Sequence, residues 1–342
     1  MLMREEEVAP PTAVETGEGA VTSASGRRWK PGLLTIAIAV LGLGGLGAGV
    51  YPMTAAWVTS FNQSQVIENY GAEIENVHPG AREQLRDARV YNDALSAGAV
   101  VLGENANLPV GEGTLSDESL DYDTILNANA EGLMARVKIP SIDVDLPVFH
   151  GTSDAVLTRG AGHLEGSHLP IGGEGTRSVI TAHRGLANAT MFTNLDQVKN
   201  GDLIVVETFG EVLAYRVRDI QVIEPQANGT IRPEVGEDLL TLITCTPLGI
   251  NTHRIVVTAE RVTPVPDAEA SAAGKPPTIP GFPWWAVLGG GGGLLLIGGY
   301  VVRQGFQDAR ASAARPLSAQ ADSTDLNTPH GDATEGLGGS NE

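Results

Sequence analysis

Two long apolar segments without charged residues limit how most of this 342-residue chain can fold. The first covers residues 33–58 and the second covers residues 284–302. About 20 apolar residues are enough to cross the core of a bilayer. The second segment opens with Trp284 and Trp285, and tryptophan is enriched where a transmembrane helix meets the membrane surface. We therefore predict two transmembrane helices that separate a central domain from two terminal tails.

Each segment has an alternative interpretation. A cleaved signal peptide has an apolar core of about 7–15 residues. Residues 33–58 are longer, and no clear Ala-x-Ala cleavage site follows them. The consecutive glycines at 289–293 resemble a flexible linker, but the apolar residues 294–297 and the arginine after them favour a span. Retention of both segments is the prediction, and cleavage of the first is the alternative.

Basic residues flank both segments on the sides away from the central domain. Cytoplasmic flanks of transmembrane helices carry an excess of lysine and arginine. Both termini are therefore predicted to lie in the cytoplasm, with the domain between the two helices outside the cell membrane. The flanking residues are Arg27, Arg28 and Lys30 before the first segment, and Arg303, Arg310 and Arg315 after the second.

Composition excludes several classes of protein. Charged residues make up only 18% of the chain, below the roughly 25% typical of soluble proteins, as expected if part of it lies in lipid. The net charge of -19 argues against nucleic-acid binding, which requires clustered lysine and arginine. The only cysteine, Cys245, excludes an intrachain disulfide and a cysteine-rich zinc cluster. A lone thiol on an exported domain is a liability unless it is used, so Cys245 is a candidate functional residue.

The region between the apolar segments changes character near residue 132. Before it, apolar residues recur at helical spacing in two stretches, separated by the break at His78-Pro79-Gly80. After it, short strands recur about every 8–12 residues, which favours a β-barrel or sandwich. One short helical piece is expected around residues 190–198. The predicted strands include 134–139, 203–207, 212–223, 240–245 and 255–262, with a hairpin around Gly210.

These patterns divide the chain into seven segments. Alanine, glycine, serine and acidic residues dominate both tails, and prolines recur between the β domain and the second apolar segment. The predicted order is a disordered tail (1–32), a transmembrane helix (33–58), a helical extension with a possible lid region (59–131), the β domain (132–263), a proline-rich linker (264–283), a transmembrane helix (284–302) and a second disordered tail (303–342).

Three residues at the ends of predicted strands carry a possible chemistry. Cys245 ends one strand and Arg254 begins the next, so the two lie near each other if these strands pair. Arginine beside a cysteine favours the reactive thiolate and supplies donors for an oxyanion. His183 lies where another strand runs into a loop, and a cysteine with a histidine nearby is a common arrangement for acyl transfer. These observations alone support only a possible Cys/His acyl transferase.

The same residues stand in stretches that resemble the sortase family. Thr244-Cys245-Thr246-Pro247 followed by Arg254 is similar to the signature of the sortase cysteine strand, and Thr181-Ala182-His183-Arg184-Gly185 is similar to the histidine segment. The resemblance covers about residues 60–263 and comes closest to class C sortases, which polymerise pilins. Stretches that favour class C are residues 149–152 and 162–170, together with an apolar anchor after the domain.

The resemblance implies a fold and an activity. The fold is mainly β: a sortase-type closed β-barrel with a helical N-terminal extension, flanked by two transmembrane helices. The activity is a cysteine transpeptidase that needs no cofactor or metal, and its partners are secreted pilin or surface proteins with a Leu-Pro-x-Thr-Gly-like signal. In it, Cys245 attacks the threonine carbonyl, His183 transfers protons, and Arg254 binds substrate and stabilises the oxyanion. The acceptor implied is a lysine amine of another pilin.

The sequence departs from the class C pattern in one respect. Many class C sortases carry an Asp-Pro-aromatic motif in a lid before the barrel, and residues 99–125 contain none. The segment 115–121 is a candidate cover for the cleft, without an identified blocking residue. Regulation by a lid is therefore not predicted.

Several residues and functions have competing interpretations. His150, His163 and His168 are expected to fix loops, and His253 and Arg184 are expected to be structural. One alternative function is a housekeeping sortase that anchors surface proteins to peptidoglycan. Another is a non-catalytic, membrane-anchored surface scaffold, and a third is a hydrolytic cysteine peptidase. The substrate protein, the acceptor lysine and the oligomeric state are left open.

Overall fold

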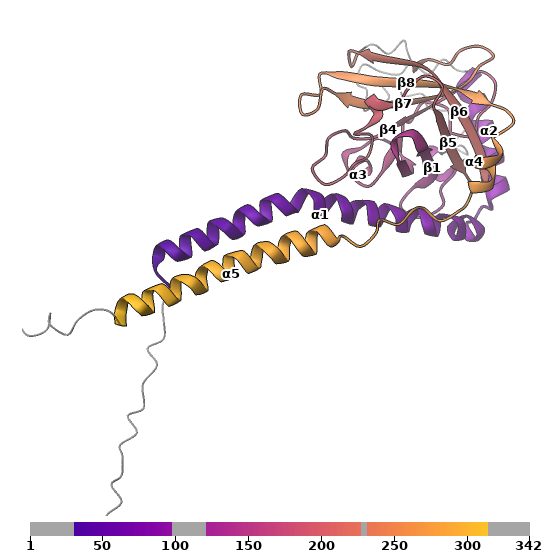
Figure 1. Ribbon diagram of the computed structural model, residues 1–342. Helices are drawn as coiled ribbons and strands as arrows, with labels where there is room; N and C mark the ends of the chain where they lie inside the picture. The colour runs from indigo at the N-terminus through magenta and orange to yellow at the C-terminus, as the bar shows by residue number, and fades with distance from the viewer. Residues whose placement is uncertain (1–30, 98–120, 227–230, 314–342) are drawn as a thin grey trace, which may run out of the picture. The chain divides into compact units, whose positions relative to one another are not determined.

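The computed structural model describes residues 31–97, 121–226 and 231–313 (Figure 1). These residues belong to two compact units. The first contains the chain up to Leu43 and from Leu294 onward, and the second runs from Gly44 to Gly293. The tails predicted to be disordered lie mostly outside the described residues, as do residues 98–120 of the region considered as a lid.

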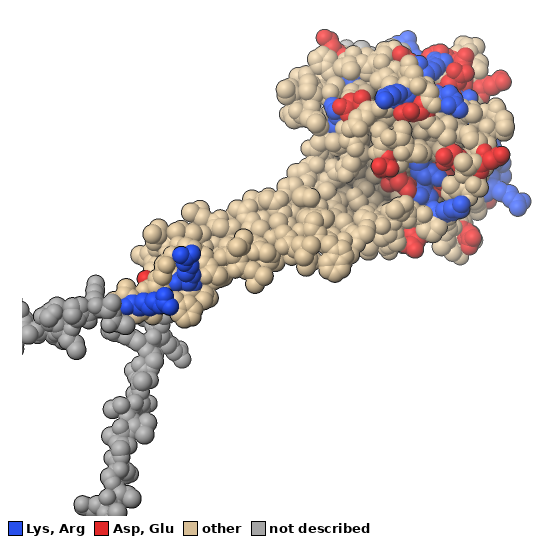
Figure 2. Space-filling view, viewed as in Figure 1, with Lys and Arg blue, Asp and Glu red and all other residues tan. Residues whose placement is uncertain are grey.

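Two long helices carry the apolar segments. They are α1 (Leu33–Asn76) and α5 (Trp284–Ala313), and both are long and apolar enough to cross a membrane. Figure 2 shows almost no charged side chain over most of their surface. In the most apolar window of α1 only 6% of the residues are buried, and in that of α5 none are. A core helix of a soluble protein would be mostly buried, so these helices suit membrane anchoring.

The helices differ from the sequence-based expectation at three places. The apolar segment 33–58 and the first helix of the extension form one helix, which continues through Pro52 to Asn76. Helix α5 continues to Ala313, so the prediction of a disordered tail from residue 303 is wrong for 303–313. The linker 264–283, predicted to be extended, contains the short helix α4 (Asp267–Ala272). The second predicted helix of the extension is confirmed as α2 (Ala81–Ala97).

Eight strands close into a barrel, as predicted, in the order β1-β2-β3-β4-β7-β8-β6-β5. Strands β2 and β3 pair in parallel, as do β4 and β7, and the other neighbours are antiparallel. The strands are β1 (Leu133–Ile139), β2 (Val144–His150), β3 (Ala161–His163), β4 (Thr176–Thr181), β5 (Leu203–Thr208), β6 (Glu211–Ile223), β7 (Asp238–Thr246) and β8 (His253–Val262).

Short helical turns connect some of these strands. The helical piece expected around residues 190–198 is a single 3-10 turn, η3 (Leu195–Gln197). Three further turns were not predicted: η1 (Tyr122–Thr124), η2 (Pro140–Ile142) and α3 (Asp154–Leu157). Each is only three or four residues long, too short to show a helical period.

Alternate residues of the central strands enter two apolar clusters. In β7, Leu240 and Leu242 are fully buried in the main core. Ile243 belongs to a second, smaller cluster with Val179 of β4 and Val256 of β8. Successive side chains of a strand point to opposite faces. Cys245, two residues after Ile243, therefore belongs to the face that carries the smaller cluster.

The C-terminal part of α1 and helix α2 are joined to the barrel by buried polar contacts. The Tyr70 hydroxyl donates to the Met134 carbonyl oxygen at 2.7 Å and accepts the Phe209 N–H at 3.0 Å. Asn92 of α2 exchanges two hydrogen bonds with the backbone of Leu169. The helical extension is thus part of the same folded unit as the barrel.

The linker after β8 is also held by the barrel. Arg136 is 5% exposed, and its Nη1 donates to the Lys275 carbonyl oxygen at 2.9 Å. The buried carboxylate of Glu207 forms ion pairs with Arg136 and Lys138 and accepts the Gly274 N–H. The segment 273–276 is therefore bound to one end of the barrel before the chain continues towards α5.

Candidate active site

Cys245 and Arg254 lie directly opposite each other on paired strands. Antiparallel β7 and β8 are joined by a tight connection, and their register pairs Cys245 with Arg254 and Ile243 with Val256. Directly opposite residues have their Cβ atoms about 4.5–5.5 Å apart and share one face of the sheet. The register thus puts Cys245 and Arg254 on the same face of the sheet, near the end of this hairpin.

His183 lies two residues after β4, the strand that pairs with β7 on its other side. Parallel β4 pairs with β7, and the register ends with Thr181 opposite Ile243. The Ala182 N–H still donates to the Ile243 carbonyl oxygen, at 3.3 Å. Continuing this register by two residues puts His183 beside Cys245. Its backbone is held on the other side too, because the His183 carbonyl oxygen accepts the Phe192 N–H at 3.0 Å.

The three side chains are partly exposed, as residues that meet a substrate must be. Nη1 of Arg254 donates to the carbonyl oxygens of Asn251 and His253, both at 3.0 Å. Nε and Nη2 of Arg254 make no hydrogen bond to the described residues. Within the described part of the chain, no hydrogen bond joins the side chains of Cys245, His183 and Arg254 to one another.

Comparisons with known proteins agree with this geometry. A model of the sortase domain matches residues 137–262. A crystal structure of sortase C-1 from Streptococcus pneumoniae is 40% identical, with a TM-score of 0.50, and the match covers 59% of this chain and 100% of that chain. The chain belongs to the sortase family. The structure of sortase C-1 from Actinomyces oris is 42% identical, with a TM-score of 0.47, over 53% of this chain and 98% of that one.

A curated sequence relative matches a smaller share of its own length. The sortase A of Streptococcus agalactiae is 28% identical over 152 residues, which make up 42% of this chain and 61% of that sortase. The chain thus spans less than two thirds of this relative. The region that matches the sortase-domain model, residues 137–262, contains the three candidate residues.

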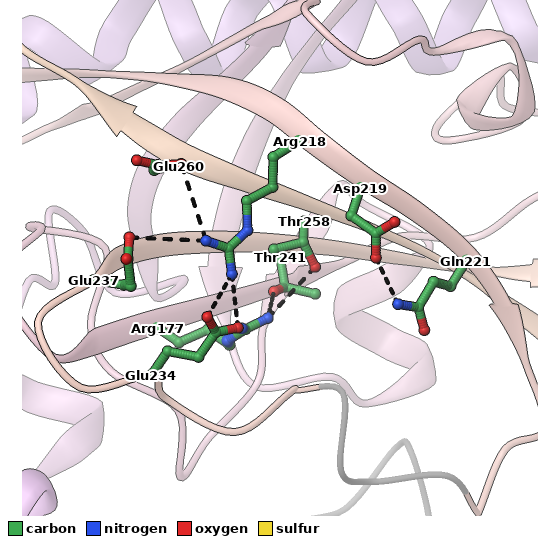
Figure 3. A network of polar contacts seen from close by, with 9 residues as sticks. All are labelled: Arg177, Arg218, Asp219, Gln221, Glu234, Glu237, Thr241, Thr258 and Glu260. Atoms are coloured by element: carbon green, nitrogen blue, oxygen red, sulfur yellow. Dashed lines mark hydrogen bonds and ion pairs between the residues drawn. The ribbon is translucent and has the colours of Figure 1, made fainter.

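Loop residues 231–237 are fixed over the outer face of the strands that carry the candidate site. Ile231 packs in the smaller apolar cluster with Ile243 and Val256. Beside it, Arg177 of β4 is only 2% exposed and donates to Glu234 at 2.8 Å, while Arg218 of β6 donates to the same carboxylate at 2.7 Å (Figure 3). In this sortase, loop residues 231–237 are thus held by β4, β6, β7 and β8, on the face of β7 that also carries Cys245.

The Arg177 network also ties neighbouring strands to each other. Nη1 of Arg177 donates to Thr241 Oγ1 of β7 at 2.9 Å, and Thr258 of β8 lies next in the same row (Figure 3). Arg218 approaches Glu237 and Glu260 as well, at 3.8 and 3.9 Å. Acidic groups therefore offset the charge of both arginines. We assign this network to fixing the loop.

The histidines expected to fix loops do so. His163 is fully buried between the Tyr122 hydroxyl, 3.0 Å from its Nδ1, and the His168 carbonyl oxygen, 2.9 Å from its Nε2. The His150 ring nitrogens lie 2.9 and 2.8 Å from the carbonyl oxygens of Gly132 and Ile125. His168 bonds to Ser96, and His253 to Thr252. The contacts of His150 and His163 hold the segments around β2 and β3 together, whereas that of His253 is local to the start of β8.

The lid region is described only at its end. Residues 115–120 of the segment considered as a cover lie outside the described residues. Asp121 is described, and its carboxylate accepts the Asp123 N–H at 3.1 Å, which caps η1. The next residue, Tyr122, is buried beside His163, and its hydroxyl also accepts the Gly151 N–H at 3.0 Å.

Burial of His163 predicts a loss of stability in mild acid. Burial lowers the pKa of His163 from 6.5 to about 3, so the folded state keeps this ring neutral while the unfolded chain protonates it. The contribution of His163 to stability is complete above pH 6.5 and is lost as the pH falls from there towards about 3. By proton linkage, this costs about 2 kcal/mol at pH 5.

The measurement is urea unfolding of the full chain in detergent micelles at pH 7 and pH 5, followed by near-ultraviolet circular dichroism. In the His163→Gln variant, the amide still donates to the His168 carbonyl oxygen but does not protonate. We expect its loss of stability between pH 7 and pH 5 to be smaller than that of the wild type by about 2 kcal/mol. Equal losses in the two proteins would refute this assignment. Buried His168, whose pKa is also lowered, is present in both proteins, so its protonation affects their losses of stability alike.

Proposed function

We propose that this chain is a membrane-anchored sortase transpeptidase that joins secreted pilin subunits through a thioester on Cys245. The observation that carries the proposal is the register that pairs Cys245 with Arg254. The register of β4 with β7 ends at Thr181 and Ile243, two residues before His183 and Cys245, and supports a role for His183. The similarity to sortase C-1 of Streptococcus pneumoniae supports the pilin-polymerising class. The substrate we propose is a Leu-Pro-x-Thr-Gly-like signal near the end of a secreted pilin or surface protein.

In the first half-reaction, Sγ of Cys245 attacks the carbonyl carbon of the signal's threonine. Nε and Nη2 of Arg254 are available to donate to the oxygen on which negative charge develops. The bond to the glycine nitrogen then breaks, and His183 gives its proton to the leaving amine. The products are a thioester on Cys245 and a released peptide that begins with glycine.

In the second half-reaction, a neutral lysine amine from another pilin attacks the thioester carbon. His183 takes the proton that this nitrogen loses as the new amide bond forms. The bond between carbon and sulfur breaks, and the thiolate of Cys245 is restored. The net result is an isopeptide bond between two proteins, and the enzyme returns to its starting state. Cysteine and histidine in such a pair titrate together, so we describe the proton as belonging to the pair.

We also propose the placement of this enzyme in the cell. The described helices α1 and α5 suit membrane anchoring, and the basic residues that flank their apolar segments favour cytoplasmic termini. The barrel, about residues 132–263, then faces outward, where secreted substrates are found. The helical extension and the linker connect this catalytic barrel to the two anchors.

The test is the mass of the full chain in detergent micelles after incubation with a library of Leu-Pro-x-Thr-Gly peptides and a candidate pilin. We expect an adduct that corresponds to the acyl group up to threonine, its absence in Cys245→Ala, and a covalent pilin dimer. An adduct that resolves only by hydrolysis or on a peptidoglycan amine would favour the wall-anchoring sortase. Absence of any adduct across the library would overturn the proposal and favour the surface scaffold.

A further inference from the structure

Arg184, the residue after His183, is bound on three sides. Its side chain is 7% exposed, and its Nη2 lies 2.7 Å from Asp196 Oδ2. Its Nε donates to the Thr193 carbonyl oxygen at 3.1 Å, and its Nη1 donates to Thr246 Oγ1 at 2.8 Å. Thr246 is the residue after Cys245. The guanidinium thus connects the two segments that leave His183 and Cys245.

This contact lies where the pairing of β4 with β7 has ended. The last backbone hydrogen bond between them runs from the Ala182 N–H to the Ile243 carbonyl oxygen. Threonine side chains continue the connection: Thr181 Oγ1 donates to the Ile243 carbonyl oxygen at 3.1 Å, and Thr244 Oγ1 to the Ala182 carbonyl oxygen at 2.8 Å. The next connection in this series is the bond between Arg184 and Thr246. It therefore holds the two strand ends together at the level of the candidate histidine and cysteine.

We propose that Arg184 is a positioning residue, which fixes the spacing between His183 and Cys245 through its hydrogen bond to Thr246. The proposal rests on the function proposed above for these two residues. Thr246 follows Cys245 in β7, so its side chain leaves the strand on the face opposite the thiol. Arg184 therefore acts from behind the pair and does not touch the substrate. The Asp196 carboxylate offsets the positive charge of Arg184. Arg184 therefore contributes to the geometry of the His183–Cys245 pair.

Arginine is suited to this place because its five donors lie in one rigid plane. One guanidinium meets a carbonyl oxygen, a hydroxyl and a carboxylate that belong to three different residues. A lysine carries a single nitrogen on a flexible stem and cannot hold all three partners in fixed directions. Arg184→Lys keeps the charge and the ion pair with Asp196 within reach, but it loosens the link to Thr246.

The experiment uses the full chain in detergent micelles as Arg184→Lys, Thr246→Val and the double variant. Arg216→Lys is the matched control, because the one side-chain hydrogen bond of Arg216 to the described residues is with the Gly201 carbonyl oxygen, and its partner in β8, Glu260, lies six residues along that strand from Arg254. We expect each single variant to lower kcat for the best peptide of the library about tenfold, within the range known for small misplacements of reacting groups. KM and the urea midpoint should stay close to those of the wild type, and the double variant should be no slower than either single variant.

A second readout does not depend on the peptide. The rate at which iodoacetamide alkylates Cys245 is measured at pH 7, since this rate depends on the groups held around the thiol. In both single variants the rate should change at least threefold, and Arg216→Lys should match the wild type. Unchanged alkylation rates, or variants that lose only stability, would overturn the positioning role. If the wild type forms no acyl-enzyme, the proposed function fails, and the alkylation rates still decide the role of Arg184.

Discussion

Replacing His183 with alanine is expected to lower kcat/KM for the sorting-signal peptide by about 10²–10⁴-fold, the usual range for loss of a general acid–base. The parallel register of β4 and β7 leads His183 to the position beside Cys245. Without an acid at this point, the glycine amine leaves as a poor, unprotonated group. Stopped-flow measurement of peptide release in the full chain gives the rate directly.

His253 provides the matched control for this substitution. It is the neighbour of Arg254 in β8 and is partly exposed like His183, and the one hydrogen bond of its ring to the described residues is with Thr252. His253→Ala should change kcat/KM by less than about threefold, in line with a surface substitution. Comparable losses in the two alanine variants would show that His183 has no special role. A His183→Ala enzyme as fast as the wild type would exclude it as the proton carrier.

Replacing Arg254 with lysine is expected to lower kcat by about 10²–10³-fold, the effect of removing one oxyanion donor. Nη1 of Arg254 is engaged by two carbonyl oxygens of its own loop, which fixes the plane of the guanidinium. This leaves Nε and Nη2 to face a substrate. A lysine has one nitrogen, and the same two carbonyl oxygens compete for it. Because lysine keeps the positive charge, the expected loss of kcat measures the contribution of the donor geometry.

The measurement is single-turnover formation of the thioester, compared among Arg254→Lys, Arg254→Met and the control Arg216→Lys. We expect Arg216→Lys to match the wild type. If Arg254→Lys and the wild type form the thioester equally fast while Arg254→Met does not, the charge of Arg254 matters and its fork of donors does not. That result would remove Arg254 from oxyanion binding.

Much of the barrel was predictable because its signals are local. Strands β5 and β6 alternate around Gly210, and β7 and β8 flank a connection rich in proline and glycine, so both hairpins are visible in the sequence. The pairing of Cys245 with Arg254 follows from that second hairpin. Strand β3 escaped prediction because its three residues, Ala161–His163, are too few to show alternation.

Other features depend on contacts that no local pattern records. The parallel pairing of β4 with β7 joins residues that lie 62 positions apart, so the sequence alone did not show that His183 arrives beside Cys245. The role of Arg184 depends on Thr246 through the same pairing. Helix α5 was predicted to end at 302 because the glycine-rich and apolar composition ends there. Residues 303–313 are nevertheless good helix formers and simply continue it.

The identity of the substrate is a different kind of question. The fold and the three candidate residues would serve a pilin polymerase and a wall-anchoring enzyme equally well, since one fold hosts several acceptors. The loop 231–237, held by Arg177 and Arg218, packs on the face of β7 that also carries Cys245.

Strands β4 and β7 lie far apart in the sequence, and this affects the order in which contacts form while the newly exported chain folds. Contacts between distant residues form late, because the chain must first close a long loop. A newly exported chain therefore displays a cysteine whose hairpin with Arg254 can form early but which has not yet met its histidine. We expect the thiol to remain a sluggish nucleophile until the barrel closes, so reactivity appears only in a finished molecule. The topology thereby acts as a safeguard against premature acylation of neighbouring proteins.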